Sequence, residues 1–283
     1  MKRLLCILLV LMPYLAYSQD WTADWDFSML MSGSTGQYLP FWARTGDDGI
    51  IPVRSSGLLT FEAEARCDVP SGFFFETGFR AAGAVAMRSP LNDKNLYGVL
   101  DRLYVSGGWK MFRLDAGMIP RHGELGRLSV TGGDIIMSGN ARNFPGVNLS
   151  SDWIHVDKGH IFGFRGNLAH YVMADNRYVK GALIHNKSLA IKVSPGRNVD
   201  IMGGLNHYVQ WGGIAQGPEG RQQQSFGDLF RILFGMKGGE DASLSDRVNA
   251  LGNHLGSEWM RLVWRAEDFV MTFQYDMPFE DGS

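Results

Sequence analysis

The sequence predicts an all-β fold, an antiparallel β-barrel of the outer-membrane type that is incomplete in this chain. Glycine supplies 36 of the 283 residues, nearly twice the usual frequency of about 7%. Aromatic residues make up 12% of the chain and charged residues only 20%. Apolar and charged side chains alternate along many segments, as in strands with two unlike faces. Tight and long connections also alternate between those segments, which is typical of an up-and-down barrel in a membrane.

Residues 1–18, MKRLLCILLVLMPYLAYS, have the pattern of a secretory signal peptide. Lys2 and Arg3 precede an apolar run over 4–15, and Ala16 and Ser18 fit the small-residue pattern before a cleavage site. The alternative is a membrane anchor helix, but the run is too short to cross about 30 Å of hydrocarbon. We therefore expect export, cleavage after Ser18, and a partial barrel domain over 19–283.

Charge and cysteine content exclude two classes of protein. Removing Lys2 and Arg3 from the 27 basic residues leaves 25 against 29 acidic residues, so no basic field indicates a nucleic-acid partner. Cleavage would also leave Cys67 as the one cysteine of the mature chain, which rules out an internal disulfide framework. Stability has to come from burial and backbone pairing.

The hairpin at 57–83 gives the clearest alternation in the chain. One face carries Phe61, Phe75 and Phe79, and the other carries Glu62, Glu64 and Arg80. In a soluble sandwich the apolar face would form the core. In a membrane barrel it would face lipid, and the charges would line a wet lumen. The organisation of the whole chain favours the second reading.

Strand-like segments follow one another along the whole mature chain. We expect eleven strands, at 20–32, 57–67, 73–85, 96–107, 111–120, 152–158, 160–173, 178–193, 199–211, 257–265 and 269–277. Five connections are tight: 68–72, 108–110, 158–159, 194–198 and 266–268. The connections that alternate with them include every long segment: 33–56, 86–95, 121–151, 174–177 and 212–256. We therefore predict a periplasmic N-terminus and external loops at 33–56, 121–151 and 212–256.

The strand count also predicts that the chain is a piece of a longer protein. A single-chain bacterial barrel has an even number of strands, and the sequence stops at 279–283, in mid-loop by this alternation. An open edge in lipid would leave backbone groups unpaired. The competing fold is a soluble β-sandwich or solenoid with a few large loops.

The connection 212–256 contains two helical patterns. Ser225 and Asp228 resemble a capping box that opens a helix, and apolar residues then follow at helical spacing. Ser243 and Asp246 open a second such run through Leu244, Val248, Leu251 and Leu255. We expect two short amphipathic helices over the barrel mouth, whose apolar stripes pack on each other and on the rim.

No residue pattern in the sequence indicates an enzyme. His155 and His160 flank a turn, and His170, His185 and His207 lie singly on separate strands, so no metal site is assigned. Glu62 and Glu64 share a strand face, but a charged lumen wall with Arg66 and Arg80 as partners explains them better than a carboxylate pair for hydrolysis. Nucleophile-elbow, zinc-protease and phosphate-loop motifs are absent. We assign no catalytic residue and no cofactor.

The predicted loops combine aromatic rings with amide, carboxylate and guanidinium groups. Sugar rings present apolar faces and hydroxyl edges, so a glycan site needs flat rings beside planar hydrogen-bonding groups. Arginines would add charge-assisted bonds to acidic sugars. The candidates for polysaccharide binding are Arg44, Arg142, Asn143, Trp153 and Trp211. Each aromatic could instead be a girdle residue at the membrane boundary.

Six stretches resemble the Wzi-type capsule assembly proteins, in the form found in Bacteroides-like bacteria. They are 36–59 (GQYLPFWARTGDDGIIPVRSSGLL), 101–121, 138–148 (SGNARNFPGVN), 151–171 (SDWIHVDKGHIFGFRGNLAHY), 177–192 and 251–283. The resemblance implies an outer-membrane β-barrel that helps attach capsular polysaccharide at the cell surface and is lectin-like rather than enzymatic. Its implied partners are capsular polysaccharide and outer-membrane lipid. This chain ends several strands earlier than the family pattern.

Two other functions compete with glycan binding. The first is a channel for oligosaccharides, in which charged strand faces line an open pore. The second is an outer-membrane hydrolase, because barrels can carry such sites. The sequence does not define the oligomeric state.

Overall fold

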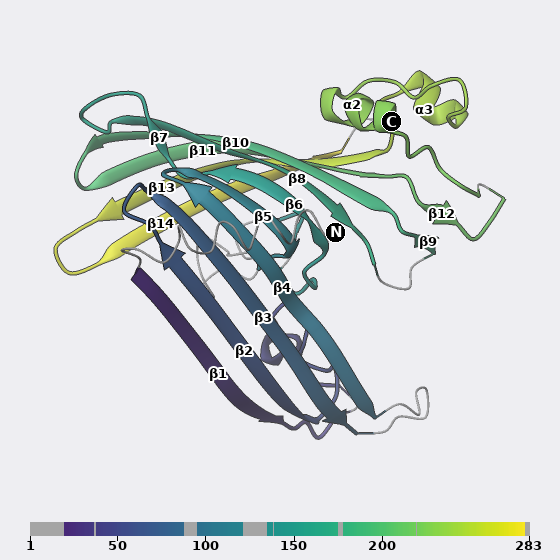
Figure 1. Cartoon of the computed structure of the whole chain (residues 1–283), viewed down its shortest axis with the longest axis horizontal. Helices are drawn as coiled ribbons and strands as arrows, with labels where there is room; N and C mark the ends of the chain where they lie inside the picture. Colours follow the sequence, from purple (N-terminus) through teal and green to yellow (C-terminus); the bar gives the residue numbers. More distant parts are fainter. Residues whose placement is uncertain are drawn as a thin grey trace, which may run out of the picture.

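The structure, a computed structural model, describes residues 20–36, 38–87, 95–120, 135–137, 139–174, 178–218 and 220–280. The expected signal peptide at 1–18 lies outside the described residues. The described chain folds into a large curved antiparallel sheet, with two short helices beside it (Figure 1). The prediction of an all-β fold is confirmed.

In the main sheet, each long strand pairs with the long strands that come before and after it in the sequence. In sheet order these are β1 (Asp20–Ser32), β2 (Ser56–Asp68), β3 (Phe73–Ala86), β4 (Leu96–Trp109), β5 (Phe112–Met118), β6 (Pro145–Ser151), β8 (Phe162–Val172), β10 (Leu183–Gly196), β11 (Val199–Trp211), β13 (Asn253–Arg265) and β14 (Val270–Glu280). The short strand β7 (Ile154–His155) pairs with β8 beside this path. A separate small sheet joins β9 (Val179–Lys180) to β12 (Ile214–Ala215).

The sheet is open among the described strands. β1 pairs with β2 and β14 pairs with β13, and the two edge strands do not pair with each other. Figure 1 shows the sheet as a curved wall with β1 and β14 at its edges. This is the up-and-down order of antiparallel strands that the sequence predicted, as in the wall of a membrane barrel.

The two faces of the wall differ in chemistry. The outer face exposes large apolar side chains on every long strand, and Phe61, Phe75 and Phe79 are 43%, 46% and 36% exposed there. The inner face carries the charged residues, and Arg80 and Asp101 are 5% and 1% exposed. The predicted faces of the 57–83 hairpin are confirmed. Exposed apolar side chains outside and buried charges inside are the reverse of a soluble protein and typical of a barrel in lipid.

The buried apolar residues form small clusters along the wall instead of one central core. One cluster joins Leu58, Ala82 and Ala84 to Ile50 on the inner face. Another joins Ala190, Met202 and Val263 to Trp259, also on the inner face. Backbone pairing across the sheet is therefore the main continuous link between distant parts of the chain.

Connections of two kinds lie at opposite ends of the strands. Those after β1, β3, β5, β8 and β11 meet at one end, called here the rim. The tight turns after β2, β4, β10 and β13, with the β7 segment, meet at the other end, called here the turn end. The predicted alternation of long and short connections is confirmed. Part of the predicted loop 121–151 lies outside the described residues.

The strand predicted at 152–158 is wrong. The ladder strand is β6, which pairs with β5 from Met118↔Pro145 to Phe112↔Ser151. Only Ile154 and His155 of the predicted segment are strand. Pro145 and Gly146 at the start of β6 resemble a loop in sequence, because neither residue favours a strand interior.

Three other boundaries differ from the predictions. The segment 178–193 is divided between β9 and β10, because Gly181 has a positive φ of 65°. β13 starts at Asn253, so Leu255 belongs to a strand and not to the second helix. Phe279 and Glu280 are in β14, so the wall continues through residues that the sequence placed in a loop.

Both predicted helices are present, but the first of them packs on a different surface from the one expected. A short 3-10 turn, η1 (Phe41–Ala43), lies in the first long connection. Helix α2 (Phe226–Phe234) begins with the expected capping box of Ser225 and Asp228, and α3 (Leu244–Val248) begins at the N-cap Ser243. Ile232 of α2 packs on residues of the outer face of β10 and β11. The placement over the barrel mouth is therefore wrong for α2, which lies outside the wall (Figure 1).

Candidate functional site

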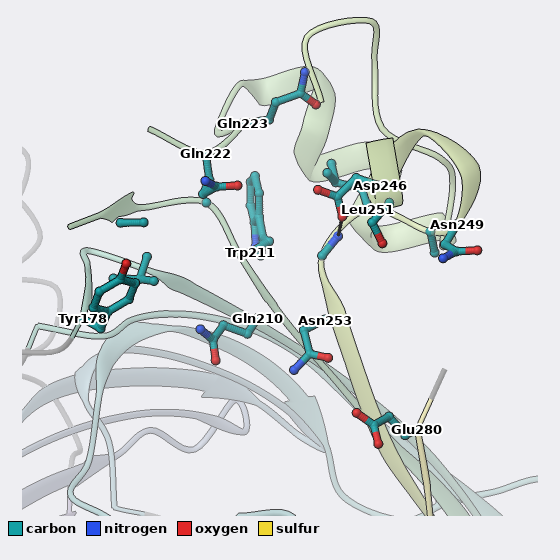
Figure 2. A pocket seen from close by; sticks show the side chains of 16 residues that line it. Tyr178, Gln210, Trp211, Gln222, Gln223, Asp246, Asn249, Leu251, Asn253 and Glu280 are labelled. Atoms are coloured by element: carbon teal, nitrogen blue, oxygen red, sulfur yellow. Dashed lines mark hydrogen bonds between the residues drawn. The ribbon is translucent and has the colours of Figure 1, made fainter. Parts of the chain in front are cut away.

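A pocket of about 490 Å³ lies at the rim, where β11, β13 and β14 meet α3 and the small sheet. We call it the rim pocket (Figure 2). Its lining consists of Tyr178, Val179, Gln210, Trp211, Gly212, Ala215, Gln222, Gln223, Ser245, Asp246, Asn249, Ala250, Leu251, Gly252, Asn253 and Glu280.

Glycines and a helix cap shape the pocket. Gly212 and Gly213 have φ of 63° and 88°, which turns the chain sharply after β11. The backbone N–H of Gly213 donates to Gln224 Oε1 at 3.2 Å. On the opposite side, Asp246 Oδ1 accepts a hydrogen bond from the Gly252 N–H at 3.1 Å, which ties α3 to the start of β13. Asp246 is therefore a structural residue of the pocket wall.

The polar groups that face the pocket are mainly amides. Gln210, Asn249 and Asn253 are exposed, and Figure 2 shows their side chains around the pocket, with Trp211 between them and Gln222. Trp211 is 5% exposed, and its indole nitrogen has no hydrogen-bond partner in the part of the chain that the structure describes. An amide both donates and accepts, and an indole N–H donates. The pocket therefore suits a ligand rich in hydroxyl groups.

The five predicted polysaccharide-binding residues do not form one site. Trp211 lines the rim pocket, and it also packs against Val209 and Ile232 in a buried cluster. Trp153 lies at the turn end, between Arg165 and Lys192, whose charged groups are 4.6 Å and 4.9 Å from its ring. Trp153 also packs on the inner-face cluster around Trp259.

The remaining three candidates lie along the inner side of the wall. Asn143 is 5% exposed, and its Nδ2 donates to Asp101 Oδ2 at 3.3 Å. Arg44 stacks over Phe41, at 5.6 Å from the ring centre, in the first long connection. That connection contacts the segment of Asn143, because the Asp48 N–H donates to the Gly139 oxygen at 2.9 Å. Arg142 is exposed on the same segment.

The first long connection reaches the inner wall through its acidic residues. Asp48, at a positive φ of 52°, accepts from Arg80 at 2.6 Å and from Arg102 at 3.3 Å. Arg80 also bonds Asp101, and Arg102 also bonds Glu62. The expected pairing of Glu62 and Glu64 with Arg66 and Arg80 is therefore wrong, because the arginine nearest to both carboxylates is Arg102. The partner Arg102 lies on β4, which pairs with β3 rather than with β2.

A second charged network lies on the inner face nearer the turn end. Arg113 donates to Glu76 at 2.8 Å and to Asp115 at 2.6 Å. Ser106 and Asn148 also donate to Asp115, at 2.6 Å and 3.1 Å. Each of these carboxylates is therefore paired, and the inner wall carries a dense set of ion pairs in which carboxylates outnumber arginines.

The histidines of neighbouring strands are not isolated from one another, contrary to the expectation. His170 and His185 are cross-strand partners, with ring centres 6.0 Å apart. His207 Nε2 and His254 Nδ1 are 3.0 Å apart. Linear spacing could not reveal this, because the four residues are on four different strands. Within the described residues, no group of three His, Cys, Asp or Glu side chains could hold a metal ion.

Sequence reasoning missed most of the rim pocket. Of its lining, only Trp211 was a predicted site residue, although Gln210 belongs to the same aromatic and polar run. Tyr178, Asn249 and Asn253 come from two different connections, and no local pattern links them. Tyr178 immediately precedes β9 and Asn253 begins β13, whereas Asn249 caps the end of α3, so strand ends could have indicated only the first two.

Comparisons with known proteins do not define a family for this chain. No family model matches the chain, and no curated protein matches it. One similar solved structure is described as BamA from Haemophilus ducreyi lacking POTRA domains 1–3. Its sequence is 11% identical, the TM-score is 0.38, and the match covers 81% of this chain and 52% of that chain. The chain therefore spans about half the length of that structure, and a likeness at this level supports no statement about activity or partners.

No helix among the described residues is both long enough and apolar enough to cross a membrane.

Proposed function

We propose that this protein is a non-catalytic outer-membrane β-barrel protein that binds capsular polysaccharide at the cell surface. The rim pocket is the observation that carries the proposal. It combines exposed amides, an aromatic ring from Tyr178 and a buried indole N–H, at the end of the strands where the long connections meet. This is the chemistry that sugar hydroxyls and sugar faces require.

The membrane part of the proposal is supported by the outer face. Apolar side chains are exposed along it from β1 to β14, including Trp25 at 75% and Phe273 at 63%. An exposed apolar surface of this extent would drive a soluble protein to aggregate, whereas lipid stabilises it. The predicted signal peptide supports export, and the two together favour the outer membrane.

The pocket also favours a class of sugar. Its described lining contains the carboxylates of Asp246 and Glu280 and no lysine or arginine. Acidic sugars would lack a cationic partner there, so neutral or amino sugars fit better. Single contacts of about 1 kcal/mol are weak. Retention would then depend on many contacts along a repeating polymer.

A channel for oligosaccharides is the alternative, because the inner face is lined with charged residues. Those charges are largely paired with one another, and Asp48 brings the first long connection against the inner wall. Both features favour a filled lumen. We therefore expect the protein in a planar bilayer to give little steady current, and a large open conductance would favour the channel.

The pocket is tested by binding of purified capsular polysaccharide to the protein in detergent, measured by calorimetry. Gln210→Ala with Asn253→Ala should weaken binding roughly 5- to 30-fold, because two hydrogen bonds are worth about 1–2 kcal/mol together. Neither amide supports the fold through a described side-chain bond, so heat-modifiable mobility should stay unchanged.

Asn198→Ala is the matched control. Asn198 is an exposed amide immediately before β11, at the opposite end of the strand from Gln210. Its removal should leave the affinity unchanged. If the double variant binds like the unsubstituted protein, the rim pocket is not the glycan site.

A further inference from the structure

The apolar surface of the outer face ends before the rim on four neighbouring strands. On β11 it runs through Ile201 and Leu205, which are 45% and 49% exposed, and the next outer-face residue is His207. On β10, Leu189 is followed by Lys187 and His185 toward the rim. Polar residues also follow on the flanking strands, His170 on β8 and Glu258 and His254 on β13, where Glu258 is the cross-strand partner of Leu205. A polar zone therefore lies on the outside of the wall, between the apolar band and the rim.

Helix α2 covers this polar zone. Ile232 is fully buried against Leu183, Val209 and Trp211, all of which belong to the outer face. Lys187 Nζ donates to the backbone oxygen of Leu233 at 2.5 Å. His185 and His254 are only 3% and 5% exposed near this cover. The helix is thus fixed to the outside of the wall (Figure 1), and its C-terminal turn reaches Lys187, two residues along β10 from the apolar Leu189.

A second apolar stripe on α2 faces away from the wall. Phe226, Phe230 and Phe234 recur every fourth residue and are 75%, 48% and 69% exposed. At about 100° per residue, this stripe lies about a third of a turn from the side of Leu229 and Ile232. The remaining third carries Asp228 and Arg231, joined by a salt bridge at 2.5 Å. The helix therefore has one face for the wall, one polar face and one unpartnered aromatic face.

We propose that the phenylalanine stripe of α2 inserts into the membrane interface beside the barrel, which makes α2 a lipid anchor. This proposal rests on the proposed membrane location. Lipid is the occupant because the stripe is exposed on the outside of the wall, on the side that carries the apolar band, and the C-terminal turn of α2 lies beside Lys187, two residues from Leu189 of that band. Amphipathic helices at this level insert their apolar face among the lipid headgroups, and aromatic rings are enriched there. Leu244 and Val248 of α3 are also exposed apolar residues.

Spin labels on the protein in phospholipid vesicles test the proposal. With Cys6→Ala and Cys67→Ala as background, Phe230→Cys carries a nitroxide on the stripe. Asp241→Cys carries one on the exposed connection between α2 and α3. Oxygen concentrates in lipid, and a water-soluble nickel complex stays in water. The ratio of the label's collision rates with oxygen and with the nickel complex should therefore be several times higher at residue 230 than at residue 241.

Leu205→Cys separates the two proposals, because Leu205 lies in the apolar band. A lipid-exposed label at 205 with a water-exposed label at 230 overturns the anchor and leaves the membrane location intact. A water-exposed label at 205 overturns both. A label at 230 that is shielded from both reagents and broadened by a second spin would mean that another copy of this chain covers the stripe, which also overturns the lipid anchor.

Discussion

Gly252 is a residue whose backbone conformation holds the rim together. Its φ is 90°, and an added Cβ would meet the backbone oxygen of Gln210. Gly252→Ala should therefore cost about 1–3 kcal/mol of local stability, since both strain and crowding oppose the side chain. Hydrogen exchange of the peptide around residues 250–255, followed by mass spectrometry, should accelerate by at least 5-fold.

Gly220→Ala is the control for that change. Gly220 also has a positive φ, of 57°, but an added Cβ would meet nothing within 4 Å. It tests backbone strain without crowding. If hydrogen exchange accelerates equally around the two substituted glycines, crowding against Gln210 does not contribute to the loss of local stability in Gly252→Ala.

The faces of single residues could be predicted from the sequence, but their partners could not. Alternation placed Arg80 on the polar face correctly, because a strand has a period of two residues. Its partners Asp48 and Asp101 come from a long connection and from β4, and no local rule pairs them with it. Trp211 shows the same limit, since the helix that buries it begins fifteen positions later in the chain.

At the scale of the strand, opposite faces should respond differently to substitution. Phe61→Arg would put a charge on the apolar outer face of β2, at a cost of about 2–4 kcal/mol near the middle of a bilayer. Glu62→Leu changes the polar inner face and should cost less. Assembly is measured by the yield of heat-modifiable protein in membrane fractions. Greater loss of assembly with Glu62→Leu would mean that the outer face does not meet lipid.

Helix α2 should respond to acid through its capping residue. Burial opposes ionisation of Asp228, but hydrogen bonds from Ser225 and Arg231 outweigh it, so the pKa of Asp228 is lowered. Because the folded pKa lies below the unfolded value of about 3.9, the stabilisation is complete above that value. It is lost as the pH falls through the folded pKa. The protection factors of the α2 amides, which compare the observed exchange rates with the intrinsic rates at the same pH, should therefore stay high at neutral pH and fall below about pH 4.

Asp228→Asn is the matched variant for this prediction. It removes the charge and the acid-sensitive step while keeping a side chain of similar shape. The protection factors in α2 should already be lower at pH 7 and should change little on acidification. An unchanged acid response in this variant would assign the transition to another group.

For the whole molecule, the two ends of the wall should lie on opposite sides of the membrane. Cysteine at Gly217, at the rim, should react with an impermeant thiol reagent on intact cells. Cysteine at Pro70, in a tight turn at the other end, should react only after the outer membrane is opened. Labelling of Pro70→Cys but not of Gly217→Cys on intact cells would invert the orientation.

The overall architecture was more predictable than the site. Strand alternation and the interleaving of short and long connections are local or nearly local signals, and they gave the order of the wall. The sequence did not predict β6, because its first residues, Pro145 and Gly146, are typical of a loop. The rim pocket is lined by residues of β11, α3 and β13. These residues come together only through the pairing of β11 with β13 and the packing of α3, which no local pattern in the sequence indicates.

The apolar band does not have the same height around the wall. Along β3 it extends from Phe73 to Val85, about 40 Å of strand, whereas along β11 it extends from Val199 to Leu205, about 20 Å of strand. In the proposed membrane location, a bilayer beside β11 would thin locally to match the shorter band, at a cost that grows with each ångström of mismatch. A helix with phenylalanines at that position would reduce the deformation. The protein would then impose an uneven thickness on the surrounding lipid and favour short-chain lipids on one flank.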